Sequence, residues 1–572
     1  MRKTVAATLA LPAALVALAV FSRSLAHGAW NALVEYQTPF ALRTPEARTT
    51  APLTGQVVFV LVDGLAYHAS RAMPFLNELR ARGADLECRI GLPSLSLPGR
   101  SVLMSGAWQE VHGQATNFNA RPLAVEHLFL TAKRRGLTTA LAAGSDPQTL
   151  FAPSVDERVV YPRLPKDQSA SLDRLHAELR WMGETTRALL RETKPHLFVM
   201  DYTIADEAGH GWGAASEEYR EAAGAVDEEI RKLAAEMDLA ASVLVVTSDH
   251  GHTPTGGHGG PEHDVIRVPL VLAGGPVRPG TRGECEQVDV APTVAALLGV
   301  AIPASNQGRP LLDALSVTPA RRQEIVQALV AQRGQFVARY VARVNGAAAP
   351  ADTRGGEPGL QDLARQAEEA KRERSEADAR RRLWVPLAVL AALAAGGALL
   401  RAAAFLPRGS YALAALAAIG AAVVYFSLLR AAGLQYSFSA VNRDEALGRF
   451  FLTDMALAVA ACALATAAAA GWLARRVGLV GLGDLSRLAL LVTAILCALL
   501  VVKMALAFWR HGIFLRWQMP DQFWAFGFYL DTLAVTALGF SAPLMPLAAW
   551  AGAAAARSVF RAPQARLAGS EG

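Results

Sequence analysis

Three histidines and one aspartate stand together in residues 246–260, VTSDHGHTPTGGHGG, directly after the apolar run SVLVV. Asp249 and His250 lie at the mouth of a predicted buried strand, and His258 follows in a glycine-rich loop that can bend back toward them. Carboxylate oxygens and imidazole nitrogens together suit zinc or a similar divalent ion. The segment therefore predicts a metal centre at the end of this strand. His252 and His263 are expected either to lie next to the ligands without binding metal or to be on the surface.

Ligands of the same type follow two other apolar runs. Asp63 ends the run FVLVD, and Asp206 and His210 lie four residues apart in DYTIADEAGH, so they share a face if this segment is helical. A single aspartate at the end of a strand is most often a turn former or a helix cap. Six such side chains at successive strand ends are better explained as ligands of two divalent ions, which we expect to be Zn²⁺.

The candidate nucleophile lies in the segment LPSLSLPGRSVLMSG. Pro98 suits the first turn of a helix, which places Ser96 at or just before the helix N-terminus, where the positive end of the dipole favours an anionic group. A serine hydroxyl becomes a good nucleophile when a metal coordinates it. The alternatives are that Ser96 is only a helix cap, or that Ser94 has this role. Asn117 could donate its amide to a phosphoryl oxygen or could simply form a turn.

The segment 52–315 has the pattern of an α/β domain that would position these side chains. Short apolar runs such as QVVFVLVDG, HLFVMD and VPLVLAGG alternate with helical segments such as SEEYREAAGAVDEEIRKLAAEMD. This alternation predicts a mostly parallel sheet with helices on both faces. Ligands in such sheets gather at the carboxyl ends of the strands.

The rest of the chain indicates a membrane protein. The composition is 52% apolar, and residues 1–26 read as a signal anchor or a signal peptide whose cleavage site would be SLA at 24–26. Residues 316–382 read as a helical, charged linker, and residues 383–556 as a transmembrane bundle. Its five long apolar runs can each cross a bilayer; they are 384–404, 410–430, 451–474, 486–509 and 524–550.

Arginines flank these runs in the manner of membrane topology rather than of a nucleic-acid-binding face, although the pI is near 9.2. With the α/β domain outside the cytoplasm, the cytoplasmic loops and the C-terminal tail hold a set of flanking arginines that satisfies the positive-inside tendency, namely Arg401, Arg408, Arg475, Arg476, Arg487, Arg557, Arg561 and Arg566. The triplet at 380–382 falls on the outer side and argues the other way. We expect an integral membrane protein with an extracytoplasmic catalytic domain.

The ligand set and the serine together resemble the alkaline phosphatase superfamily, in its phosphodiesterase and phosphotransferase branch. Within it, SLPGR and SDHGHTPTGGHG are most similar to segments of the GPI ethanolamine phosphate transferases, as is the layout of an N-terminal span, a catalytic domain and a membrane bundle. The stretch at 288–311 is similar to the closing segment of the superfamily.

The resemblance implies two metal sites and a phospho-serine intermediate. One site would use Asp206, His210 and His258, and the other would use Asp63, Asp249 and His250, with Ser96 bridging the two ions as nucleophile. The chain departs from the transferases in having fewer spans and in carrying Arg100 where a histidine often follows the Pro-Gly turn. SLPGR also fits the sulfatase nucleophile pattern, but a sulfatase site would need further acidic residues beside Asp63, where Gly-Leu-Ala stands instead.

These observations predict a membrane-anchored, two-zinc phosphodiesterase or phosphotransferase that acts on a phospholipid or a lipid-linked glycan. The alternatives are a nucleotide pyrophosphatase-like phosphodiesterase, a sulfatase, and a non-catalytic membrane scaffold. Whether water or another acceptor resolves the phospho-enzyme does not follow from the sequence. Asp454, Lys503 and Asp531 lie within apolar runs, and we expect them near the outer leaflet, where they either pair and bind a lipid headgroup or only reach the interface.

Overall fold

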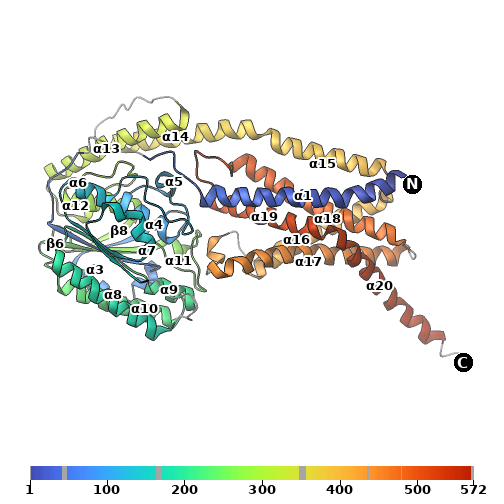
Figure 1. Cartoon of the computed structure of the whole chain (residues 1–572), viewed down its shortest axis with the longest axis horizontal. Coiled ribbons are helices and arrows are strands. Elements are labelled where there is room, and N and C mark those ends of the chain that lie inside the picture. The colour runs from blue at the N-terminus through green and yellow to red at the C-terminus, as the bar shows by residue number, and fades with distance from the viewer. Residues whose placement is uncertain are drawn as a thin grey trace.

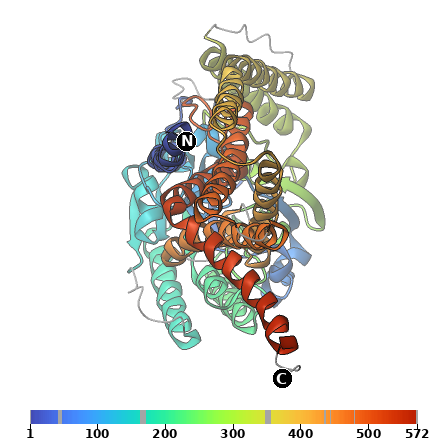
Figure 2. The same ribbon diagram turned by 90° about the vertical axis from the view of Figure 1, so that its right-hand side faces the viewer.

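The computed structural model describes residues 2–41, 48–162, 171–346, 356–433, 437–441, 444–477 and 480–568. An α/β domain forms one end of the molecule, and a bundle of long helices extends from it (Figure 1). Viewed from the end of the bundle, the helices lie in front of the α/β domain (Figure 2). The two parts expected from hydropathy are therefore distinct in space.

One eight-stranded sheet, in the order β4-β3-β5-β1-β6-β7-β2-β8, organises the α/β domain. Its strands are β1 Gln56–Val62, β2 Ala84–Arg89, β3 Thr139–Ala143, β4 Glu157–Val160, β5 Leu197–Tyr202, β6 Ser242–Thr247, β7 Arg267–Ala273 and β8 Thr281–Glu286. Strand β7 runs antiparallel to β6 and β2, and the other neighbours are parallel. The predicted mostly parallel sheet is confirmed. Cys88 and Cys285 face each other across β2 and β8 as free thiols.

Helices cover both faces of the sheet because its central strands are apolar on both sides. In β1, Val57, Phe59 and Leu61 enter one core, whereas the residues between them enter the other. The first face carries α4 Ser96–Ser105, α6 Leu128–Arg134, α7 Ser145–Phe151 and α12 Val290–Leu298. The second face carries α2 Tyr67–Ser70, α3 Pro74–Arg82, α8 Leu172–Thr193, α9 Ile204–Trp212 and α10 Glu217–Ala235. Short helices α5 Gln109–His112 and α11 His263–Ile266 lie in the connections.

The region expected as a charged linker contains two long helices, α13 Pro319–Asn345 and α14 Glu357–Arg382. They pack against each other, and α13 inserts Ile325 and Leu329 into the core of the α/β domain. Helix α14 leads into the bundle through α15 (Figure 1). The packing of α13 therefore extends the α/β domain beyond residue 315.

The bundle consists of α1 Arg2–Val34, α15 Trp384–Ala402, α16 Arg408–Ala431, α17 Asp444–Val477, α18 Leu482–His511, α19 Gln522–Ser541 and α20 Met545–Ala568. Within the described residues, six helical segments are long and apolar enough to cross a membrane, one N-terminal and five C-terminal. They indicate an integral membrane protein. The last of these segments is broken by a 3-10 turn at Ala542–Leu544, after which α20 diverges from the other helices (Figures 1 and 2).

Helix α1 runs unbroken through residues 24–26 and packs along α19. The Ser22 hydroxyl donates to the carbonyl oxygen of Thr532 at 2.9 Å. A Cβ on Gly539 would lie 2.5 Å from the carbonyl oxygen of Leu15, so the absence of a side chain lets the two backbones approach closely.

Candidate active site

The three central strands deliver three carboxylates to one edge of the sheet. Strand β1 lies between β5 and β6, and its Leu61 is level with Asp201 on one side and Thr247 on the other. Asp63 follows the end of β1, and Asp249 follows the end of β6. Parallel neighbours end at the same edge, so these side chains meet there. Asp201 joins them but was missed from the sequence, although HLFVMD has the same apolar-run-then-aspartate pattern as FVLVD.

Asp63, Asp249 and His250 form one group of potential metal ligands, with one ligand atom from each lying within 4.8 Å of the others. All three residues are buried. The His250 Nδ1 donates to the carbonyl oxygen of Gly251 at 3.2 Å, which leaves Nε2 as the atom that can accept a hydrogen bond or bind a cation. Gly99 of α4 makes this group possible, because a Cβ there would lie 2.9 Å from Asp249 Cβ.

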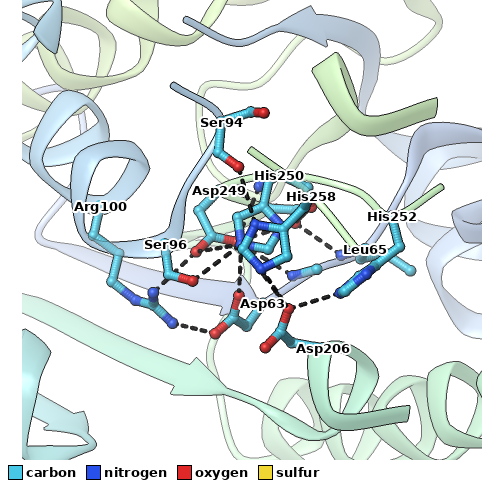
Figure 3. Close-up of polar contacts among 12 residues, drawn as sticks. Asp63, Leu65, Ser94, Ser96, Arg100, Asp206, Asp249, His250, His252 and His258 are labelled. Atoms are coloured by element: carbon cyan, nitrogen blue, oxygen red, sulfur yellow. Dashed lines mark hydrogen bonds and ion pairs between the residues drawn. The ribbon is translucent and has the colours of Figure 1, made fainter. Parts of the chain in front are cut away.

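Asp206, His210, His252 and His258 form a second group within the same 4.8 Å limit (Figure 3). His258 Nδ1 donates to the carbonyl oxygen of Ser94 at 3.1 Å, so its Nε2 faces His210 Nε2 at 3.3 Å. The rings of His250 and His258 stack at 3.7 Å, which brings the two groups together. The structure thus places all six ligands expected from the sequence at one site.

His252 also belongs to this site, whereas His263 does not. The His252 ring is fully buried, and its Nε2 lies 2.7 Å from Asp206 Oδ1. Room for the ring comes from Gly209, where a Cβ would lie 2.5 Å from it. His263 is largely exposed and lies beside Asp264. His252 is therefore either a fourth ligand of the second group or the residue that orients Asp206.

The donor set fits divalent cations. Asp63 Oδ1 and His252 Nδ1 are buried and have no hydrogen-bond partner among the described residues, and buried polar atoms are rarely left so. Burial lowers the pKa of His250 to about 4, and it also lowers that of His258, with neighbouring imidazoles adding to the effect. Both rings are therefore neutral at pH 7, the form that binds metal. Burial alone would raise the pKa of Asp206, but His210 and His252 outweigh it and hold this pKa well below its usual value.

Arg100 supplies positive charge at the rear of the first group. Its guanidinium contacts Asp63 at 2.5 Å, Asp201 at 2.8 Å and Asp249 at 3.0 Å, and its side chain is 7% exposed (Figure 3). Burial would lower the pKa of Arg100, but the three carboxylates raise it well above its usual value. Burial raises the pKa of Asp201 to about 7 despite the guanidinium. The arginine noted as a departure from the family pattern therefore balances the charge of three buried carboxylates.

Ser96 is the first residue of α4, and its hydroxyl points at the ligand groups. Ser96 Oγ lies 3.0 Å from His250 Nε2, and Asn117 Nδ2 lies 3.5 Å from the same oxygen. Ser96 makes no capping hydrogen bond, because the cap position is Leu95. Ser94 instead points away, donating its hydroxyl to the carbonyl oxygen of Gly260 at 2.7 Å. Of the two serines, Ser96 is therefore the one whose hydroxyl lies beside the ligand groups.

The N-terminus of α4 offers fewer free N–H groups than expected. The amide of Leu97 donates to Asn117 Oδ1 at 2.9 Å, and that of Gly99 donates to the carbonyl oxygen of Leu95 at 2.9 Å. Pro98 has no N–H. Asn117 therefore both caps the helix and presents its amide to Ser96, so the side-chain amide replaces the backbone groups as the donor closest to the nucleophile.

The three ionisable residues within the bundle are all engaged by side chains of neighbouring helices. Lys503 Nζ donates to Asp531 Oδ1 at 2.9 Å, and Tyr425 donates to Asp454 Oδ1 at 2.7 Å. Asp454 and Asp531 are buried. Lys503 and Asp531 therefore offset the cost of placing a charge within a span by pairing with each other, rather than by extending to the membrane interface.

Comparison with known proteins shows what this chain is similar to. The model of the type I phosphodiesterase / nucleotide pyrophosphatase family matches residues 57–268. The catalytic subunit of GPI ethanolamine phosphate transferase 2 of Homo sapiens is 23% identical over 299 residues, covering 48% of this chain and 29% of that protein. GPI ethanolamine phosphate transferase 1 of Emericella nidulans is 24% identical over 272 residues, covering 40% of this chain and 29% of that protein. Among solved structures, alkaline phosphatase PafA has a TM-score of 0.40 and 10% identity, covering 46% of this chain and 99% of PafA.

The chain thus spans less than a third of the length of these transferase relatives. The matches confirm the resemblance to the phosphodiesterase and phosphotransferase branch of the alkaline phosphatase superfamily. Residues 57–268 match the model of the type I phosphodiesterase / nucleotide pyrophosphatase family, and the chain is similar to the GPI ethanolamine phosphate transferases over that region.

Proposed function

We propose that this protein is a membrane-anchored, two-zinc enzyme that transfers or cleaves a phosphodiester through a phospho-Ser96 intermediate, in the manner of a phosphoethanolamine transferase. The observation that carries the proposal is the position of Ser96 Oγ, 3.0 Å from His250 Nε2, beside two groups of buried carboxylates and imidazoles. The names of its relatives support phosphoethanolamine as the transferred group.

The residues divide the chemistry between them. Ser96 Oγ attacks phosphorus, and the leaving oxygen takes the electron pair of the broken P–O bond. Asn117 Nδ2 donates to a phosphoryl oxygen, since it faces the nucleophile. Asp63, Asp249 and His250 would hold one zinc ion, and Asp206, His210 and His258 the other, with Ser96 between them. Bound zinc would supply Lewis acidity that stabilises charge on the attacking and leaving oxygens. An acceptor hydroxyl or water then displaces Ser96.

A lipid or lipid-linked substrate is supported by aromatic side chains beside the nucleophile. Phe118 follows Asn117, is exposed, and lies 5.5 Å from the ring of Trp30 on α1. Trp30 in turn contacts Tyr529 of α19 at 5.5 Å and Phe451 of α17 at 6.2 Å. These rings lie at the helix ends nearest the α/β domain, and aromatic rings at such positions suit the interface of a membrane. A membrane-embedded substrate would thus reach Ser96 along them.

The proposed location of the catalytic domain is outside the cytoplasm. The N-terminus of α1, which carries Arg2 and Lys3, lies at the end of the bundle remote from the α/β domain (Figure 1). The helix ends that meet at α15–α16 and at α17–α18 lie at the same end of the bundle (Figure 1), and they carry Arg401, Arg408, Arg475, Arg476 and Arg487. The positive-inside tendency then assigns that end to the cytoplasm.

A nucleotide pyrophosphatase-like hydrolase is the second candidate, favoured by the description of the matching family. The test is the purified full-length protein with zinc, assayed on bis-p-nitrophenyl phosphate, the phosphate monoester, the sulfate ester, a nucleotide pyrophosphate and phosphatidylethanolamine vesicles. We expect diester cleavage to exceed cleavage of the sulfate and the nucleotide, and transfer of label from the lipid to an alcohol acceptor would distinguish transferase from hydrolase.

The matched variant is Ser96→Ala, with Ser94→Ala as its control. Ser96→Ala should keep its zinc and lose diester cleavage by several orders of magnitude, because the nucleophile acts as part of one catalytic unit. Normal turnover by Ser96→Ala, with Ser94→Ala inactive, would move the nucleophile to Ser94. Absence of turnover by the zinc-loaded parent on every ester would favour a non-catalytic scaffold.

A further inference from the structure

The glycine-rich loop that carries His258 lies between the α/β domain and the membrane bundle. On one side it is fastened to the segment of the nucleophile. Gly259 N donates to Ser94 Oγ at 3.1 Å, Ser94 Oγ donates to the carbonyl oxygen of Gly260 at 2.7 Å, and His258 Nδ1 donates to the carbonyl oxygen of Ser94. This side lies wholly within the α/β domain.

The other side of the loop is fastened to the membrane bundle. Gly260 N donates to the hydroxyl of Ser439 at 2.9 Å, and that hydroxyl donates to Glu262 Oε2 at 2.6 Å. Ser439 belongs to the 3-10 turn Phe438–Ala440 between α16 and α17. Gln522, the first residue of α19, donates its side-chain amide to the carbonyl oxygen of Gly259. Two different connections of the bundle therefore bind the backbone next to His258.

These contacts are buried and leave no spare room. Ser439, Gln522 and His258 are each at most 7% exposed. A Cβ on Gly259 would lie 2.7 Å from Phe438 Cβ, and a Cβ on Gly260 would lie 1.9 Å from the Ser437 hydroxyl oxygen. The turn is itself held in the bundle, because the Phe438 ring packs on Phe526 of α19 at 4.8 Å. Contacts with both the α/β domain and the membrane bundle therefore fix the conformation of the loop.

We propose that Ser439 and Gln522 are positioning residues for the metal centre, through which the membrane bundle sets the place of His258. The inference rests on the proposed function, since it takes His258 to be a ligand of one of two zinc ions. Neither side chain contacts a ligand atom of the site; each holds the backbone on which His258 stands. Hydrogen bonds that orient a metal ligand affect metal affinity by roughly 10–100-fold when they are removed.

The test uses the full-length protein in detergent, with Ser439→Ala, Gln522→Leu and the conservative Ser439→Thr. The matched control is Ser486→Ala, whose hydroxyl donates only to the carbonyl oxygen of Leu482 in its own helix. Affinity for each Co²⁺ ion is measured by chelator competition and by the visible spectrum of the bound ion. Both deletion variants should bind one of two ions about 10–100-fold more weakly and keep the other. The control should match the parent, and Ser439→Thr, which keeps the hydroxyl but adds a methyl group where there is no spare room, should fall between the parent and Ser439→Ala.

Hydrogen exchange of the segment 258–262 gives a second measurement that does not require metal. Ser439→Ala should speed exchange of the Gly260 amide, because its acceptor is removed, without changing exchange in the sheet. Unchanged affinity for both ions in both deletion variants would overturn the inference, as would equal loss of both ions with general loss of protection. A parent that binds no ion and cleaves no diester would instead refute the proposed function itself.

Discussion

Replacing Arg100 by methionine tests the charge balance of the site. Within the described residues, Arg100 is the only arginine or lysine that pairs with Asp63, Asp201 and Asp249, and these three carboxylates are at most 4% exposed. Removing one partner of a buried ion pair typically destabilises a protein by about 3–5 kcal/mol, because a charge is left uncompensated. At roughly 2 °C per kcal/mol for a domain of this size, we expect the melting temperature of the metal-free protein to fall by about 6–10 °C.

The pH dependence sharpens this prediction. Without Arg100 the pKa of Asp201 and that of Asp249 rise, because the guanidinium lowers both, and Asp201 already has a pKa of about 7. At pH 6 a proton can then replace part of the lost positive charge, whereas at pH 8.5 it cannot. The fall in melting temperature should therefore be larger at pH 8.5 than at pH 6. Saturating zinc should reduce it, because cations near Asp63 and Asp249 supply the same compensation.

The assay is thermal unfolding of the full chain in detergent with EDTA, followed by tryptophan fluorescence. Arg220→Met is the control, since Arg220 makes an exposed pair with Glu217 that contributes little to stability. Arg100→Lys, which keeps a charge but loses the fork geometry, should fall between the parent and Arg100→Met. A melting temperature for Arg100→Met within about 2 °C of the parent at pH 8.5 would refute the reasoning, because it would contradict the destabilisation expected from a broken buried pair.

Three other perturbations test the metal ligands, the bundle and the buried histidines. His258→Ala should lower zinc content from two ions per chain toward one by elemental analysis, and an unchanged content would transfer the ligand role to His252. Lys503→Met should reduce turnover of a lipid phosphodiester in vesicles while a soluble chromogenic diester is still cleaved normally; equal turnover of both would leave the bundle as an anchor. Burial lowers the pKa of His127 to about 3, so the unfolded chain takes up a proton below about pH 6.5 that the folded chain does not. Stability should therefore fall by up to roughly 2 kcal/mol between pH 6.5 and pH 5, and His127→Phe, measured by urea unfolding at both pH values, should lose part of that dependence.

The meeting of the expected ligands at one place could be predicted from the sequence, because Asp63, Asp206 and Asp249 come after apolar runs and parallel strands end at one edge. Arg100 left a weaker signal. It lies four residues after Ser96 in a helix and so shares its face, but the carboxylates that it contacts come from three strands distant in sequence. Asp201 also follows an apolar run, but the same segment contains Asp206 four residues before His210, and that pair gives the stronger signal for a metal ligand. His252 needed the structure, since only the packing of its ring against Gly209 distinguishes it from exposed His263.

Hydropathy located the spans but not their contacts. The run 524–550 was expected as one segment, whereas the 3-10 turn that contains Pro543 divides it, as a proline within a helical pattern would indicate. The turn at Phe438–Ala440 lies between two spans in a stretch without apolar periodicity. Its hydrogen bonds to the loop of His258 depend on how the bundle docks on the α/β domain, and no local pattern encodes that docking.

The pairing of α1 with α19 constrains the order in which the protein can be assembled. Ser22 and Thr532 are 510 residues apart in sequence, and the whole α/β domain is synthesised between them. Helix α1 must therefore wait for α19 before its small-residue face is covered. Forming a contact between residues so far apart in sequence is slow compared with forming contacts between consecutive helices. The α/β domain can fold during that wait, so the newly made protein passes through a stage in which a folded sheet is tethered to an open bundle.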